Sequence, residues 1–256
     1  MAHPEQLQFF GLVAGHNRQA IMDGRVLEIG SYDVNGSVRA LFDGAREYVG
    51  VDLIEGPGVD QVAYGHEIDE PVGAFDLTLS GECFEHDPQW SDTFTNMIRL
   101  TRPGGLVTFT CASHGRPEHG TRRSEVRDSP GTLAQNSDYY RNLRRTDFES
   151  LPLSTWFATW RFWLMPTTFD LYFAGVRGGA PSTFVLPTDE DVAPIGKLLP
   201  WPHRIARAPL RLAAAMIDDE QRYQDTILPY WRFLLRRSEP YQRASRTLTS
   251  QPDDQS

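Results

Sequence analysis

The first candidate for ligand binding is a turn that follows the first apolar run of the chain. Between Glu28 and Gly36 the sequence reads EIGSYDVNG, and its glycines permit a close approach of the backbone to a ligand. Tyr32 occupies the second glycine position of a dinucleotide-binding turn, and Glu28 and Asp33 add negative charge. The turn therefore suits a cationic ligand better than a diphosphate, although it could also merely connect two elements.

Asp52 adds a second feature, because it ends the next apolar run 22 residues after Gly30. A carboxylate at that point can accept hydrogen bonds from both hydroxyls of an adenosine ribose. The turn and Asp52 together predict a site for a cofactor that contains adenosine.

Two acid–base candidates, Glu82 and His86, follow the fourth apolar run. An imidazole titrates near neutral pH, so we expect His86 to be the better catalytic base and Glu82 the second candidate. Alternatively, His86 only orients its loop and Glu82 is a solvated carboxylate. His114 and His119 follow the fifth run on either side of Glu118. They could line an acceptor pocket or bind a divalent ion, but a polar loop is the simpler interpretation, and no metal is expected.

The order of the apolar runs predicts an alternating α/β domain. Asp87 and Pro88 are typical of a helix start, and the segment from Arg102 to Gly105 is typical of its end. Strands separated by helices imply parallel crossovers and hence a doubly wound sheet. Strands are expected at residues 26–29, 48–53, 59–63, 75–80 and 106–111, helices at 1–25, 37–42 and after 87, and an antiparallel hairpin at 156–164 and 169–176.

Composition limits the class of protein. The chain has 256 residues, 40% of them hydrophobic, so a sizeable core can form without disulfides. A formal net charge of −9 disfavours nucleic acid as a partner. Cys83 and Cys111 are too few for a disulfide framework, so buried thiols in a reducing compartment are expected. No apolar run approaches the ~20 residues of a membrane span, and no Lys or Arg precedes the apolar stretch at 9–15. We therefore expect a cytoplasmic protein that is not integral to a membrane.

Three regions differ in pattern. Residues 1–180 are expected to form the main domain, in which 114–150 are a polar insertion. Residues 181–244 are expected to be a helical C-terminal extension, and 245–256 a disordered tail. Aromatic residues and arginines alternate between Pro229 and Arg237. This segment could meet acidic lipid headgroups, but the favoured interpretation is a helix that packs on the core or joins a homo-oligomer.

Four segments, in this order, resemble a class I S-adenosylmethionine-dependent methyltransferase of the methyltransferase type 11 group. They are VLEIG at 26–30, YVGVD at 48–52, FDLTLS at 75–80 followed by FEH at 84–86, and RPGG at 102–105. The resemblance covers residues 24–112 well and 145–177 loosely. It implies a Rossmann-like, doubly wound, mostly parallel seven-stranded sheet with an antiparallel last strand. One departure is the glycine loop, which is longer than the family pattern and retains only Gly30 and Gly36.

The resemblance also implies S-adenosyl-L-methionine as the cofactor. Glu28 would anchor the turn near the amino-acid end of the cofactor, Asp52 would hold the ribose, and Leu53 would pack on the adenine. Residues 65–67 fall where the family places an adenine-edge residue, and residues 80–82 would face the transferred methyl group. The expected cofactor-binding residues are Glu28, Gly30, Ser31, Asn35, Gly36, Asp52, Leu53, His66, Glu67 and Ser80.

The reaction expected from this resemblance is O-methylation of a hydroxyl on a small molecule or glycan. Such a transfer needs an aligned nucleophile and a base, for which His86 and Glu82 are the candidates. We expect the insertion to act as a lid whose acceptor contacts are Arg116, His119, Tyr139 and Tyr140. The alternatives are N- or C-methylation of another metabolite and a non-catalytic cofactor-binding subunit. An RNA methyltransferase is disfavoured because residues 80–83 read SGEC in place of an Asn-Pro-Pro-Tyr type of tetrad.

Overall fold

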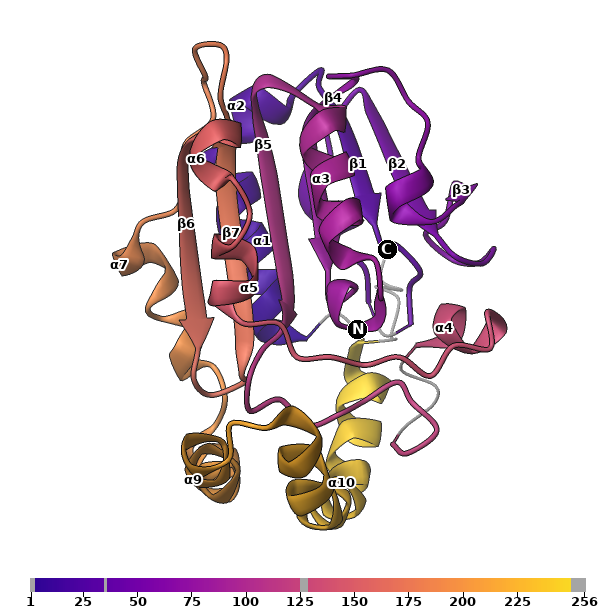
Figure 1. Ribbon diagram of the computed structural model, residues 1–256, viewed down its shortest axis with the longest axis vertical. Coiled ribbons are helices and arrows are strands. Elements are labelled where there is room, and N and C mark those ends of the chain that lie inside the picture. The colour runs from indigo at the N-terminus through magenta and orange to yellow at the C-terminus, as the bar shows by residue number, and fades with distance from the viewer. Residues whose placement is uncertain (1–2, 35, 125–128, 250–256) are drawn as a thin grey trace, which may run out of the picture.

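A seven-stranded sheet forms the centre of the protein, whose computed structural model describes residues 3–34, 36–124 and 129–249 (Figure 1). Its strand order is β3-β2-β1-β4-β5-β7-β6. Strand β7 runs antiparallel to both of its neighbours, and the other neighbouring pairs are parallel. The fold expected from the class I methyltransferase resemblance is thus confirmed. The strands are β1 (Arg25–Ile29), β2 (Glu47–Asp52), β3 (Gln61–Val62), β4 (Phe75–Gly81), β5 (Thr101–Ala112), β6 (Phe157–Met165) and β7 (Asp170–Arg177).

Helices cover both faces of this sheet. Figure 1 shows α3, α5 and α6 in front of it, α1 and α2 behind it, and α4, α9 and α10 below the carboxyl ends of the parallel strands. In the part of the chain that the structure describes, no helix is long and apolar enough to cross a membrane. The α-helices are α1 (Pro4–His16), α2 (Arg18–Ile21), α3 (Trp90–Leu100), α4 (Pro130–Ala134), α5 (Arg145–Glu149), α6 (Leu153–Trp156), α7 (Asp189–Val192), α8 (Trp201–Ala206), α9 (Ala208–Met216) and α10 (Glu220–Thr249). Short 3-10 helices are η1 (Arg39–Phe42), η2 (Gly65–Glu67), η3 (Phe84–His86) and η5 (Ile195–Lys197).

The core has two layers because successive side chains of a strand point to opposite faces of the sheet. On one face, Phe94 of α3 packs with Phe109, Phe148 and Phe173, which are all fully buried. On the other face the core includes buried residues of α1, among them Phe9. The apolar runs of the strands are thus explained by burial on both faces.

Some expected boundaries are wrong. Helix α3 begins at Trp90 rather than at Asp87. The Asp87 carboxylate accepts hydrogen bonds from Gln89 N–H at 2.8 Å and from the Thr93 hydroxyl at 2.5 Å, so residues 87–89 form a turn before the helix. Strand β5 already begins at Thr101, and the expected helix at 37–42 is only the 3-10 turn η1.

The C-terminal helices meet the polar insertion beyond the sheet. The Tyr223 hydroxyl of α10 donates to the carbonyl of Gly115 at 2.7 Å, and the Gln224 side chain accepts from Glu118 N–H at 2.8 Å. Gln224 also donates to the carbonyl of Arg116 at 2.8 Å. The insertion therefore packs against α10 at this point. Helix α10 continues through Thr249, into the segment from 245 that is expected to be a tail, and residues 250–256 lie outside the described residues.

Candidate active site

A cavity of about 240 Å³ lies at the carboxyl edge of the sheet. It is lined by the ends of β1, β2 and β4, by residues 63–65, by the loop that follows β4 and by parts of 129–137. Strands β1 and β4 are neighbours from which the chain proceeds in opposite directions along the sheet. In open α/β sheets, ligands bind in the crevice at such a switch point. The cavity is therefore the first candidate for a cofactor site.

The turn after β1 approaches the loop after β4 very closely. Gly30 has a φ of +82°, and a Cβ placed on it would lie 2.7 Å from the Cβ of Cys83. Only glycine permits this conformation together with this contact. Gly36 also has a positive φ, of +123°, but it does not line the cavity, and Asn35 lies outside the described residues.

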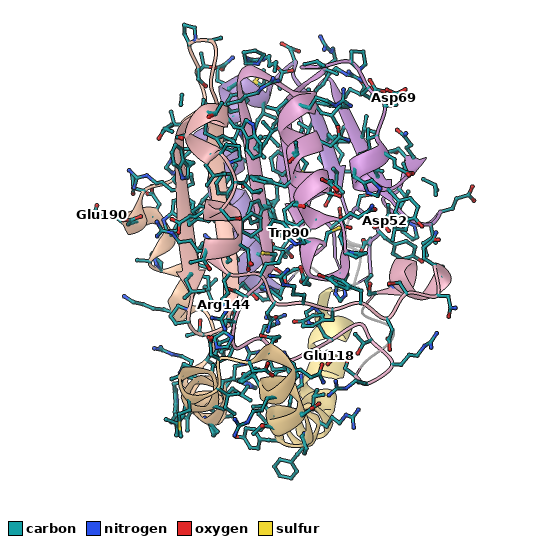
Figure 2. All side chains as sticks on the ribbon, viewed as in Figure 1. Asp52, Asp69, Trp90, Glu118, Arg144 and Glu190 are labelled. Carbon is teal, nitrogen blue, oxygen red and sulfur yellow. The ribbon has the colours of Figure 1, made fainter. Side chains whose placement is uncertain are left out.

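The Asp52 carboxylate lines the cavity at the end of β2, above α4 in the view of Figure 2. Its Oδ2 accepts a hydrogen bond from Tyr32 N–H at 2.9 Å, and its Oδ1 accepts one from Leu53 N–H at 2.7 Å. These bonds orient the carboxylate while each oxygen retains a second lone pair. Burial raises the pKa of Asp52, although the two hydrogen bonds oppose that effect. Leu53 lines the cavity beside it.

Glu82 lines the cavity where β4 ends, in a strained conformation with a φ of +52°. Its side chain is buried, and within the described residues neither of its carboxylate oxygens has a hydrogen-bond partner. Arg116 Nη2 lies 3.9 Å from Glu82 Oε2, and His3 Nε2 lies 4.0 Å from it. Burial and then the charge of Asp170 raise the pKa of Glu82. A carboxylate in a cavity wall whose oxygens accept no hydrogen bond from the described residues is suited to accept a proton from a ligand.

His86, at the end of η3, also lines the cavity. Its Nδ1 is buried and has no hydrogen-bond partner among the described residues. Burial lowers the pKa of His86 to about 3, so the imidazole is neutral at neutral pH. The ring stands 5.1 Å from the ring of His119 and 5.4 Å from that of Tyr140, measured between ring centres.

Part of the insertion covers the cavity beside Asp52 and Leu53. A Cβ on Gly131 of α4 would lie 3.0 Å from Asp52 Oδ1. Gln135 accepts from the Tyr64 hydroxyl at 3.0 Å and donates to the carbonyl of Leu53 at 3.5 Å. The residues that line the cavity do not include the four expected acceptor contacts Arg116, His119, Tyr139 and Tyr140. Arg116 nevertheless lies beside Glu82, and the rings of His119 and Tyr140 lie beside His86.

Several expected cofactor contacts also lie away from the cavity. Glu28 points to the opposite face of β1 from Ile29, where it accepts a hydrogen bond from the Tyr48 hydroxyl at 2.7 Å. The Ser80 hydroxyl donates to the carbonyl of Ile29 at 2.9 Å. Tyr64 and Gly65 line the cavity, whereas His66 and Glu67, which were expected to do so, do not. The expected residues that do not line it are Glu28, Ser31, Gly36, His66, Glu67 and Ser80.

Three residues near the cavity, two of them fully buried, were not expected from the sequence. Glu85 has no exposed surface, and its Oε1 lies 3.7 Å from His119 Nε2. Asp170 is equally buried, 3.2 Å from His3 Nε2 and 3.0 Å from Arg116 Nη1. An aspartate that begins an otherwise apolar strand was the available signal for Asp170. His3 carried no signal, because it joins the group only through tertiary packing.

Comparison with known proteins gives partial likenesses to solved methyltransferases. No family model and no curated protein matches the chain. The phosphoethanolamine N-methyltransferase 2 of Haemonchus contortus is 17% identical, with 62% of this chain and 49% of that chain covered and a TM-score of 0.46. The 1,6-didemethyltoxoflavin-N1-methyltransferase of Burkholderia thailandensis is 18% identical, with 69% of this chain and 80% of that chain covered and a TM-score of 0.47.

The YcgJ protein of Bacillus subtilis is 12% identical, with 70% of this chain and 100% of that chain covered and a TM-score of 0.46. The chain spans about half the length of the Haemonchus enzyme. At these scores the likenesses identify neither a substrate nor a set of site residues.

Proposed function

We propose that the chain binds S-adenosylmethionine in this cavity and transfers its methyl group to a hydroxyl of a small polar molecule or glycan. The observation that carries the proposal is the composition of one cavity wall. It combines the close glycine turn at Gly30, the oriented carboxylate of Asp52 and the carboxylate of Glu82, whose oxygens accept no hydrogen bond from the described residues.

The residues present fit the cofactor. Asp52 offers two oxygens that backbone N–H groups already hold in place, which is what a pair of ribose hydroxyls requires. Leu53 and Tyr64 provide apolar surface for an adenine ring on the same side of the cavity. The turn at Gly30 brings backbone within reach of the amino-acid end. When bound, the cofactor supplies a methyl group on a positively charged sulfur.

Glu82 is the residue best placed to take the proton of the acceptor. Its buried oxygens have no hydrogen-bond partner in the described part of the chain, so an acceptor hydroxyl would satisfy one of them. The raised pKa of Glu82 brings the carboxylate closer to the range in which a general base works well. Arg116 and His3 keep the buried charge compensated. His86 borders the same cavity.

The experiment is a transfer assay with methyl-labelled S-adenosylmethionine and three groups of acceptors: glycans and small polyols, amines, and RNA. We expect the wild type to transfer label to the hydroxyl compounds. Glu82→Gln should lose this transfer, and the control Glu55→Gln, whose side chain is exposed, should retain it. Label that appears only in amines or at carbon replaces O-methylation with the corresponding reaction. Binding of the cofactor without transfer to any acceptor overturns the enzymatic proposal in favour of a non-catalytic subunit.

A further inference from the structure

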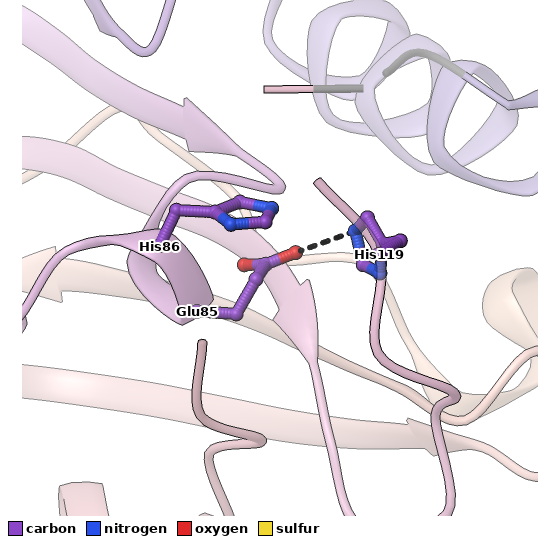
Figure 3. Close-up of side chains that lie close together, drawn as sticks. All are labelled: Glu85, His86 and His119. Atoms are coloured by element: carbon purple, nitrogen blue, oxygen red, sulfur yellow. Dashed lines mark ion pairs between the residues drawn. The ribbon is translucent and has the colours of Figure 1, made fainter. Parts of the chain in front are cut away.

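Glu85, His86 and His119 form a compact group of metal-binding side chains at the edge of the cavity. Glu85 and His86 belong to η3 after β4, and His119 lies in the insertion after β5. One donor atom from each residue lies within 4.8 Å of the other two. Figure 3 shows the Glu85 carboxylate beside both imidazole rings. The group therefore joins two loops that are more than thirty residues apart in the sequence.

The buried donor atoms of this group lack hydrogen bonds. Glu85 has no exposed surface, and within the described residues neither of its carboxylate oxygens is hydrogen-bonded. The Nδ1 of His86 is in the same situation. A buried carboxylate without such partners is costly unless a cation compensates it. Among the described residues, its ion-pair contact is with the imidazole of His119, whose Nε2 lies 3.7 Å from Glu85 Oε1.

The environment of His119 leaves the nitrogen that faces Glu85 free to coordinate. Its Nδ1 lies 3.3 Å from the carbonyl oxygen of Pro117, and because a carbonyl only accepts, this nitrogen must carry the proton. The Nε2 then has a free lone pair, and it is this atom that lies 3.7 Å from Glu85 Oε1. A histidine ligand whose other nitrogen donates to a backbone carbonyl is the usual arrangement at metal centres.

The backbone at Gly120 also allows the insertion to come close to η3. Gly120 has a φ of +68°, and a Cβ on it would lie 2.7 Å from Cε1 of His86. Only a glycine here lets the insertion bring His119 against η3. Two imidazole nitrogens and one carboxylate oxygen are a donor set for zinc or iron, and the bonds of zinc to such atoms measure about 2.0–2.2 Å. The three donor atoms need only draw closer around a shared ion.

A neighbouring group does not require an ion. His3, Glu82 and Asp170 also place donor atoms within 4.8 Å of one another. There, however, the guanidinium of Arg116 lies 3.0 Å from Asp170 and 3.9 Å from Glu82, and it already supplies the positive charge. This difference separates the two groups and supplies a control for the experiment.

We propose that Glu85, His86 and His119 bind one divalent transition-metal ion, with Zn²⁺ as the expected occupant. Because His86 lines the cavity, the ion borders the space that an acceptor would occupy. An ion there would lower the pKa of a hydroxyl bound to it. The binding claim itself does not depend on the proposed methyl transfer, because it is tested without cofactor or acceptor.

The test is a calorimetric titration of the chelator-stripped protein with Zn²⁺, together with the visible absorption of the Co²⁺ form. We expect one equivalent to bind, and His119→Gln to weaken binding at least ~100-fold, since even loss of an outer partner of a ligand costs 10–100-fold. Zn²⁺ should also raise the melting temperature of the wild type but not that of His119→Gln. The melting temperature without metal shows whether that variant is folded.

Two matched histidine variants serve as controls. His3→Gln alters the neighbouring group, and His16→Gln alters a surface histidine that lies 3.7 Å from Asp191. Both should retain the wild-type affinity for Zn²⁺. Absence of Zn²⁺ and Co²⁺ binding by the wild type overturns the proposal. So does binding that survives in a folded His119→Gln protein, or binding that is lost in folded His3→Gln and retained in His119→Gln.

Discussion

At the scale of single residues, the described part of the chain holds a few buried carboxylates whose oxygens lack hydrogen bonds. Glu82 is the one that lines the cavity, and it sits at a strained φ of +52°. Strain and unmet hydrogen-bonding capacity at one position are typical of a functional residue rather than of a packing residue. Substitution of Glu82 should therefore change the rate of turnover more than the affinity for the cofactor.

Glu82→Gln should lower kcat by about 10²–10⁴-fold, the usual contribution of a general base, because the amide cannot take the acceptor proton. The affinity for S-adenosylhomocysteine should change little. Steady-state kinetics with an accepted hydroxyl substrate, paired with calorimetry, measures both quantities. The control is Glu55→Gln, whose side chain is exposed. Equal losses of turnover and cofactor affinity would assign Glu82 to cofactor binding instead.

A second residue-scale prediction concerns Glu28, which the structure places against Tyr48 and away from the cavity. Burial raises the pKa of Glu28 to about 7, above its ordinary value of 4.5. Between these pH values the unfolded chain loses the proton and the folded chain keeps it, so stability falls as pH rises. Glu28→Gln removes this loss. Between pH 4 and pH 8, the free energy of unfolding of Glu28→Gln should therefore rise relative to that of the wild type by up to about 3 kcal/mol.

Urea unfolding at the two pH values measures the difference for Glu28→Gln. Tyr48→Phe is the matched variant, because it deletes the donor of the 2.7 Å hydrogen bond and leaves the carboxyl in place. A Glu28→Gln protein that follows the wild type at both pH values would show that the carboxyl is charged when folded. A large loss of cofactor affinity in that variant would restore Glu28 to the cofactor site.

At the scale of elements, the sequence predicts the strands well and the insertion poorly. Apolar runs bounded by turns identify β1, β2 and β4 within a residue or two, because their burial is local to the sheet. The start of α3 is misplaced, since the Asp87 side chain bonds to the turn and to Thr93 instead of capping the helix at its own position. The contacts of the insertion with α10 depend on residues about one hundred positions away, and no local pattern encodes them.

Segment 129–137 should contribute to cofactor binding because its helix α4 stands over Asp52. Gln135→Ala removes the hydrogen bonds to Tyr64 and Leu53 and should weaken binding of S-adenosylhomocysteine about fivefold, as expected for a loss of about 1 kcal/mol. The control is Gln221→Ala, which removes an exposed 3.0 Å bond to Asp225 on α10. Unchanged cofactor affinity together with a raised KM for the acceptor would return this segment to the role of an acceptor lid.

At the scale of the whole molecule, segments from both ends of the chain converge on the carboxyl edge of the sheet. His3, before α1, lies 3.2 Å from Asp170 of β7. Tyr223 and Gln224 of α10 bond to the insertion on the same side. This convergence explains why Asp52, Glu82 and His86 are accessible to sequence reasoning while the pairing of His3 with Asp170 is not. The former follow strands of the sheet, whereas the latter meet only after the chain has folded.

The ion pair of His3 should make stability depend on pH. Burial alone would lower the pKa of His3, but the charge of Asp170, supported by Glu5 and Glu82, outweighs it and raises the pKa to about 9. Arg116 faces the same group and pairs with Asp170. The contribution of protonated His3 to the stability of the fold is complete below pH 6.5, the ordinary pKa of histidine. It is lost as pH rises through 9.

The wild type should therefore lose up to about 3 kcal/mol between pH 6.5 and 9.5 that His3→Gln does not lose. Denaturant unfolding of both proteins across this range measures the difference. His16→Gln, on the opposite end of α1, should follow the wild type. Parallel curves for His3→Gln and the wild type would show that His3 is neutral in the folded protein.

The most direct test of the central claim is a calorimetric titration of the protein with S-adenosylhomocysteine. We expect one site per chain, and binding about 5- to 150-fold weaker in Asp52→Asn, because loss of a buried acceptor costs about 1–3 kcal/mol. The exposed control Asp69→Asn should bind as the wild type does. A wild-type protein that prefers NAD⁺, or an Asp52→Asn variant with unchanged affinity, would contradict the assignment of this cavity to S-adenosylmethionine.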